Sequence, residues 1–264
     1  EHTHALPPSR CFKRAPAIGL GDAIRALLSL PAPPTRPDLL RYSDIDEDDI
    51  ASVLRYMRNQ AVSIKKRPAF MTLSGTLRAP LTDDEVQVLI MYKSESPFPV
   101  YKWLNAWLTQ DRRDPEVVDK VGPLFTHLYR AQEKLPQVKK QAARAVIVHD
   151  ISALRSTFDN YKQRLAPGSE LNFWGFSSFS TDDNVINSEV FLGKPHEDAI
   201  IFQCGELTGV DMEAFNPGLA SEEEILPLAP AIFRVLTATK YGHKVFVAIE
   251  QLSHAEHAYV LPRQ

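Results

Sequence analysis

Apolar positions in the first half of the chain recur at helical spacing and predict successive amphipathic helices. Ile50, Val53, Leu54 and Met57 lie at i, i+3, i+4 and i+7, so they share one face of a helix. The acidic residues 44–49 precede this run, which suits a helix N-terminus because the helix dipole is positive there.

Three more helices are expected downstream. Thr82 and Glu85 have the spacing of a capping box ahead of an apolar run. The next helix presents one apolar face over residues 100–108, and another runs from Pro115 to Leu135. We expect these apolar faces to form a hydrophobic core.

The pattern becomes strand-like after Lys140. A helix is still expected over 152–165 and a short one after Asp182. The expected strands cover residues 145–148, 171–176, 199–204, 232–239 and 244–249. Helices first and strands later favour an α+β fold over alternating βαβ units.

The N-terminal part of the chain is rich in proline. Seven of the 20 prolines fall within the first 37 residues, and a short apolar patch at 18–30 interrupts them. Because proline prevents longer regular structure on either side, this patch predicts one short helix. We expect residues 1–77 to form a Pro-rich leader with one or two helices, ahead of a separate domain at 78–264.

Composition excludes several classes of protein. The 264 residues are 44% hydrophobic and 24% charged, as in ordinary globular chains, which excludes collagen-like, coiled-coil and wholly disordered proteins. The net charge of -3 gives no excess of positive charge for a phosphate backbone, so nucleic-acid binding is not expected. No apolar stretch approaches the roughly 18 residues that a membrane span needs.

Cysteine and histidine give little indication of a bridge or a metal site. The chain has two cysteines, Cys11 and Cys204, too few for a disulfide framework, although one bridge is possible. Cys204 lies in an apolar run and is expected to be inert core. His196, and His254 with His257, have too few ligands at metal spacing, so no metal is expected.

Three separate segments combine polar groups with strand context. Arg144 stands at the start of an apolar run, where an always-charged guanidinium is costly without an anionic partner. A serine-rich segment, 174–181, follows an expected strand, and Glu222 and Glu224 stand at the entrance of another. Because residues two apart on a strand share a face, the two carboxylates are expected to project together.

In this order, the segments resemble the arginine–serine–glutamate class of mono-ADP-ribosyltransferases. The resemblance covers about residues 78–252 and includes further landmarks of the family. They are Thr82-Asp83-Asp84-Glu85, Leu104-Asn105, Glu133-Lys134-Leu135-Pro136, Phe173-Trp174-Gly175-Phe176 and Ile232-Phe233-Arg234-Val235. It implies N-terminal helices packed on a two-sheet β core, NAD as the substrate, and a protein arginine as the acceptor. It also implies a toxin or effector that is secreted or delivered to a host.

The resemblance also implies roles for individual residues. Glu224 would bind the 2′-hydroxyl of the nicotinamide ribose, and Ser178 would hydrogen-bond the Glu224 carboxylate. Arg144 would pair with the diphosphate or its ribose, and Glu222 would select arginine as the acceptor. Phe191, or Trp174 and Phe176, would stack on the nicotinamide.

A second arginine could also match the arginine of the family's motif. Leu128-Tyr129-Arg130 also resembles the family's aromatic-arginine element. Arg130, however, lies inside the helical run Val117–Gln132, whereas the family's arginine is on a strand. Arg144 is therefore the preferred candidate.

Two positions depart from the family pattern. Ala145 stands where the family usually has glycine, and it can hold the nicotinamide amide through its backbone if its φ is negative. Phe179 fills the middle of the Ser-Thr-Ser element, either as an aromatic wall of the site or as a sign of a weaker enzyme. Two other functions therefore remain open: an NAD glycohydrolase, or a degenerate binding domain of the same fold.

Overall fold

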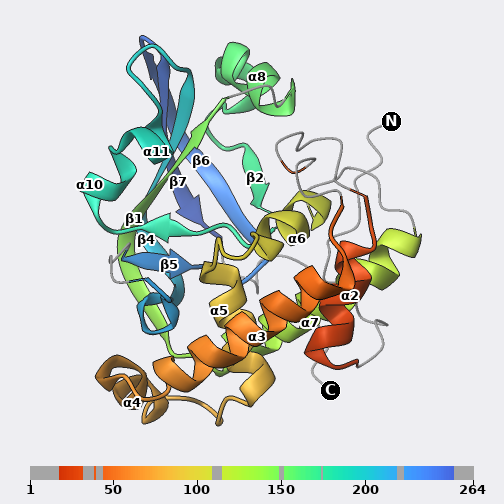
Figure 1. The fold of residues 1–264 in the computed structure, drawn as a ribbon. Helices are drawn as coiled ribbons and strands as arrows, with labels where there is room; N and C mark the ends of the chain where they lie inside the picture. The colour runs from red at the N-terminus through yellow and green to blue at the C-terminus, as the bar shows by residue number, and fades with distance from the viewer. Residues whose placement is uncertain are drawn as a thin grey trace.

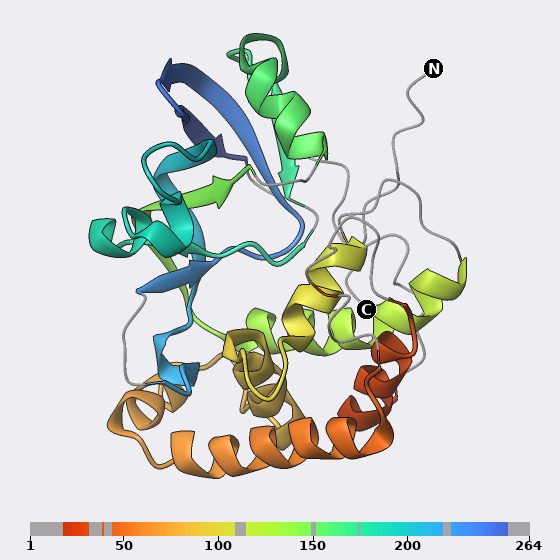
Figure 2. The ribbon, with the colours of Figure 1, turned by 45° about the horizontal axis from the view of Figure 1, so that its top comes forward.

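The structure is a computed structural model of the 264-residue chain. It describes residues 18–31, 39, 44–108, 115–148, 152–173, 175–218 and 223–252. Helices α2 to α7 gather on one side of the molecule and the strands on the other (Figures 1 and 2). This segregation is the α+β arrangement expected from the order of elements.

The helical half contains the five expected helices near their expected positions and one, α4, that was not predicted. These elements are α2 (Leu20–Leu28), α3 (Glu47–Ile64), α4 (Pro68–Ser74), α5 (Asp83–Lys93), α6 (Val100–Leu108) and α7 (Pro115–Lys134). The predicted capping box is present at α5: Glu85 N donates to Thr82 Oγ1 at 3.2 Å, and Thr82 N donates to the Glu85 carboxylate at 2.7 Å. This fixes the start of α5, and α5 in turn supplies side chains to the pocket described below.

The helices before residue 78 pack into the same hydrophobic core as those after it. Ile24 of α2 and Val53 of α3 are 0% and 2% exposed and belong to one cluster with α5, α6 and α7. In α4, Phe70 makes an edge-to-face contact with Phe215 at 5.9 Å between ring centroids. The boundary at residue 77 stays a prediction, but α2 to α4 share the core of the body.

The strands form one mixed sheet. They are β1 (Gln137–Ile147), β2 (Glu170–Phe173), β3 (Phe179–Ser180), β4 (Ala199–Asp211), β5 (Glu224–Leu226), β6 (Ala231–Tyr241) and β7 (Lys244–Gln251). Their order is β1-β3-β5-β4-β7-β6-β2, and β1 also pairs with β4.

The two sheets expected from the family resemblance are therefore joined in the described part of the chain. The joining element is β4, because this 13-residue strand pairs with β1, β5 and β7. The pairings β1–β3–β5–β4–β1 close a ring around one end of the sheet. Gly209 permits this closure, since a Cβ there would come within 2.8 Å of Ile225 and of the Leu226 carbonyl oxygen.

Several element boundaries differ from the prediction. Strand β1 begins eight residues earlier than expected, because its polar first half pairs with β4 and carries no apolar signal. Strand β2 ends at Phe173 rather than Phe176, where the chain leaves β6. The helix expected over 152–165 is two pieces, α8 (Ser152–Asp159) and α9 (Tyr161–Arg164), separated at Asn160. Helices α10 (Asp183–Ile186) and α11 (Glu189–Leu192) follow β3.

Within the described ranges, no helix is long and apolar enough to cross a membrane.

Candidate functional site

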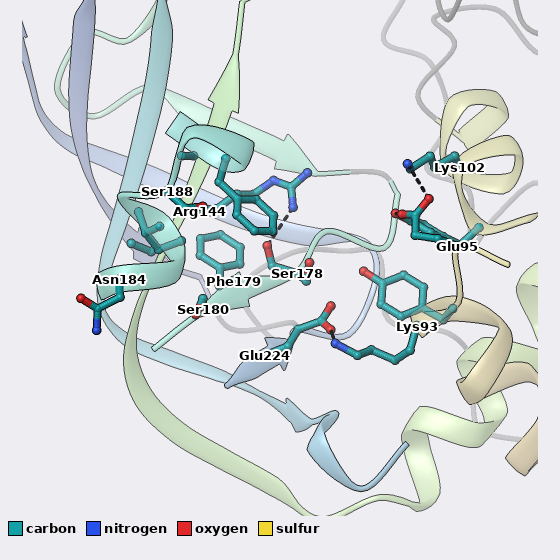
Figure 3. A pocket seen from close by; sticks show the side chains of 16 residues that line it. Lys93, Glu95, Lys102, Arg144, Ser178, Phe179, Ser180, Asn184, Ser188 and Glu224 are labelled. Atoms are coloured by element: carbon teal, nitrogen blue, oxygen red, sulfur yellow. Dashed lines mark hydrogen bonds and ion pairs between the residues drawn. The ribbon is translucent and has the colours of Figure 1, made fainter. Parts of the chain in front are cut away.

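A pocket of about 880 Å³ lies between the ring of strands and the helical half (Figure 3). Strands β1, β3 and β5 form one wall, the end of α5 and the start of α6 form the opposite wall, and α10 and α11 border it. Its volume is in the range of pockets that hold small-molecule ligands. Arg144, Ser178 and Glu224, predicted from three distant segments, all line it.

Arg144 projects from β1 into this pocket (Figure 3). Its Nη1 donates to the Ser178 carbonyl oxygen at 2.8 Å. Burial lowers the pKa of Arg144, while Tyr92, Glu224 and Tyr101 raise it. Among the described residues no carboxylate lies within ion-pair distance of this guanidinium, so its remaining donors are available to an anionic ligand.

The serine segment is held in place by α6. Asn105 bridges the main chain of Phe176: its Nδ2 donates to the Phe176 carbonyl oxygen at 2.8 Å, and its Oδ1 accepts from Phe176 N at 2.8 Å. Gly175 allows this approach, because a Cβ there would lie 2.8 Å from Asn105 Oδ1. Tyr92 of α5 donates to the same carbonyl at 3.2 Å. The helical half thus sets the position of Ser178, two residues farther on.

Glu224 is buried at the start of β5, with 9% of its side chain exposed. The main chain of Glu224 is fixed by register with Ser180 and by a hydrogen bond from Met212 N to its carbonyl oxygen at 3.0 Å. The expected partner of the carboxylate was Ser178, but its ion-pair partner is the ammonium group of Lys93. Burial and Glu224 both raise the pKa of Tyr92, and hydrogen bonding to Ser178 lowers it.

Sequence reasoning did not identify Lys93. It is the last residue of α5, and a lysine in the last turn of a helix is ordinary because it complements the helix dipole. The side chain is nevertheless 3% exposed and points into the pocket (Figure 3). Tyr92, Glu95 and Tyr101 also line this wall and were not predicted.

Only one carboxylate of the Glu-x-Glu pair, that of Glu224, belongs to the described residues. Glu222 lies outside the described residues, so its placement beside Glu224 stays a prediction. The argument from strand alternation does not hold across Glu223, which has φ +43°, because alternation requires extended backbone at that position. Strand β5 begins only at Glu224.

The other expected site residues divide between pocket and core. Ala145 and Phe191 line the pocket, and Phe191 is 38% exposed. Glu223 alone among the described non-glycine residues has a positive φ. The φ of Ala145 is therefore negative, as its backbone needs to hold the nicotinamide amide. Phe179 borders the pocket but is 1% exposed and packs against Phe173 and Phe233, so it is a core residue.

The exposure of the other candidate residues shows which of them belong to the core. Phe176 is 1% exposed and packs on Tyr92 and Phe125, so its ring is core. Arg130 is exposed on α7, on a helix as expected. Cys204 is buried, and burial raises the pKa of its thiol, so it is inert core. Trp174 lies outside the described residues.

Comparison with known proteins identifies the fold. No family model matches the sequence, and no characterised protein matches it by sequence. Among solved structures, it is similar to the type III effector XopAI from Xanthomonas axonopodis pv. citri, with 12% identity and a TM-score of 0.57 over 88% of this chain and 82% of that one.

Two structures described as ADP-ribosyltransferases are also similar. The eukaryotic mono-ADP-ribosyltransferase ART2.2 has 14% identity and a TM-score of 0.53, over 89% of this chain and 87% of that chain. The enzyme Vis, from Vibrio splendidus, has 18% identity and a TM-score of 0.52 in its complex with agmatine, over 83% and 91% of the two chains. The chain therefore has the ADP-ribosyltransferase fold.

Proposed function

We propose that this chain cleaves the nicotinamide–ribose bond of NAD and transfers the ADP-ribose to an arginine side chain of a protein. The observation that supports this is the convergence of Arg144, Ser178 and Glu224 on one pocket of an ADP-ribosyltransferase fold. Three segments 34 to 46 residues apart in sequence meet there, as the family resemblance requires.

The pocket has the charges that NAD cleavage needs. The bond from the ribose C1′ to the nicotinamide nitrogen breaks with its electron pair leaving on nicotinamide, so positive charge develops on the ribose. A fixed carboxylate at Glu224 stabilises that charge. Arg144 has donors that are not engaged by a described carboxylate, and its planar fork suits the diphosphate. Phe191 and the Ala145 backbone would hold the nicotinamide.

The acceptor in this proposal is a guanidinium group. A guanidinium has a pKa above about 12 and is a poor nucleophile while protonated. Glu222 would orient it and accept a proton as its nitrogen bonds to C1′. The similar structure of Vis contains agmatine, itself a guanidino compound, which favours an arginine acceptor.

The same comparisons favour a protein that acts on another cell. Vis is described as a toxin and XopAI as a type III effector. We therefore propose that this chain is a secreted or delivered effector whose substrate is a host protein.

Labelled NAD, incubated with the protein with and without agmatine, tests the proposal. We expect release of nicotinamide and a labelled agmatine adduct. Glu222→Gln should abolish the adduct and retain NAD hydrolysis, and Glu224→Gln should abolish both. Release of nicotinamide without adduct would indicate an NAD glycohydrolase instead, and the absence of both products would indicate a binding domain without turnover.

A further inference from the structure

The carboxylate proposed to act on NAD forms a buried ion pair with a lysine from the helical half of the molecule. Lys93 Nζ contacts Glu224 Oε2, with 3% and 9% of the two side chains exposed. Lys93 comes from the end of α5 and Glu224 from the start of β5, 131 residues later. The contact therefore spans the two halves of the fold across the pocket (Figure 3).

We propose that Lys93 is a positioning residue: its ammonium group holds one oxygen of Glu224, so that the other oxygen faces the ribose of NAD. This rests on the proposed function and deepens it. Lys93 takes the place that Ser178 was expected to occupy, since the carboxylate contacts Lys93 rather than the serine.

The end of α5, which carries Lys93, is held by contacts of the residues on both sides of the lysine. Tyr92, the preceding residue, donates to the Phe176 carbonyl oxygen at 3.2 Å and packs on Tyr101 with 5.5 Å between ring centroids. Ser94, the following residue, donates through Oγ to the Ile90 carbonyl oxygen at 2.7 Å. These contacts fix the backbone from which the Lys93 side chain extends toward Glu224.

Charged and titratable groups face Glu224 from each neighbouring element. Lys93 and Tyr92 reach it from α5, Tyr101 from α6 and Arg144 from β1. Glu95, in the segment between α5 and α6, is paired with Lys102 at 2.8 Å. Lys93 is the cation in ion-pair contact with Glu224 within the described residues, and Arg144 and Lys102 are the other cations that line the pocket.

Loss of Lys93 therefore removes the group that holds one oxygen of Glu224. The carboxylate would then turn toward Arg144, away from the ribose and into the position of the diphosphate. This change lowers the rate of NAD cleavage.

The test is the steady-state rate of nicotinamide release by the full chain. For Lys93→Met we expect kcat to fall at least about tenfold, as for other misplaced catalytic groups, with KM changing less. Lys93→Arg keeps a cation that can pair with the Glu224 carboxylate and should keep most of the wild-type kcat.

A matched control is Lys134→Met. Lys134, the last residue of α7, pairs at 2.7 Å with Glu85 in the first turn of α5, so this variant also breaks a lysine–carboxylate pair made by α5. It should lower the melting temperature and leave kcat unchanged. If Lys93→Met does not fold, Lys93→Arg and Lys93→Gln give the same comparison of charge kept against charge lost.

The outcomes separate this inference from the function on which it rests. Wild-type protein without nicotinamide release overturns the proposed function. An active wild type, with Glu224→Gln inactive and Lys93→Met unchanged or faster, overturns the role of Lys93 alone. A Lys93→Arg enzyme that is as slow as Lys93→Met shows that the cation at this position does not hold Glu224, and also overturns it.

Discussion

Substitution of Asn105 by alanine tests how the helical half positions the serine segment. The side chain makes two hydrogen bonds of 2.8 Å with the main chain of Phe176, whose side chain is 1% exposed. After the substitution the Phe176 carbonyl keeps the Tyr92 hydroxyl at 3.2 Å, but its N–H loses the asparagine acceptor. Loss of these two hydrogen bonds, with one donor left unsatisfied, should lower the free energy of unfolding by about 2–4 kcal/mol.

Urea unfolding of Asn105→Ala measures this cost. We expect a lower midpoint with an unchanged m-value, because the area exposed on unfolding is nearly the same. At urea concentrations where the variant is still folded, its rate of nicotinamide release should also be at least about tenfold lower than that of the wild type. The reason is that Ser178, whose carbonyl oxygen accepts the Arg144 hydrogen bond, lies two residues after Phe176.

Asn160→Ala is the matched control. Its Nδ2 donates to the Ser156 carbonyl oxygen at 3.1 Å within one exposed turn, so the change should stay within about 0.5 kcal/mol. An Asn105→Ala protein as stable and as active as Asn160→Ala would refute the claim that α6 fixes the serine segment.

Three further predictions follow from other parts of the structure. Arg144→Lys, which loses the planar fork, should weaken NAD binding about 10- to 100-fold in calorimetry. Deletion of residues 1–77 removes buried α2 and α3 from the shared core, so circular dichroism should show a lower melting temperature or no cooperative transition. Burial raises the pKa of Asp198, but hydrogen bonds from Arg155 and His243 lower it more. Asp198→Asn should therefore cost stability above about pH 4, and this difference should vanish as the pH falls through the lowered folded pKa.

Each of these has a contrary outcome. If Arg144→Lys binds NAD as tightly as the wild type, Arg144 does not pair with the diphosphate. A fragment 78–264 that melts like the full chain would show that the leader is dispensable for the core. A stability difference between wild type and Asp198→Asn that grows toward low pH would reverse the sign argued for that carboxylate.

The sequence determined most of the helical half and the composition of the site. Helices α3, α5, α6 and α7 were predictable because their apolar faces and the Thr82–Glu85 capping box are local patterns. Arg144, Ser178 and Glu224 were predicted as site residues through the order of their motifs, and all three line one pocket. The strand ends were less predictable, because the polar first half of β1 is a strand only through its pairing with β4.

Tertiary structure alone decided the partner of Glu224. Lys93 ends α5, where a lysine is ordinary on local grounds, and 131 residues separate it from the carboxylate that it contacts. Nothing in the local pattern at either position specifies the other. A single joined sheet and the core position of Phe179 were decided in the same way. Local spacing encodes helices and caps, whereas contacts between distant segments arise only when the whole chain packs.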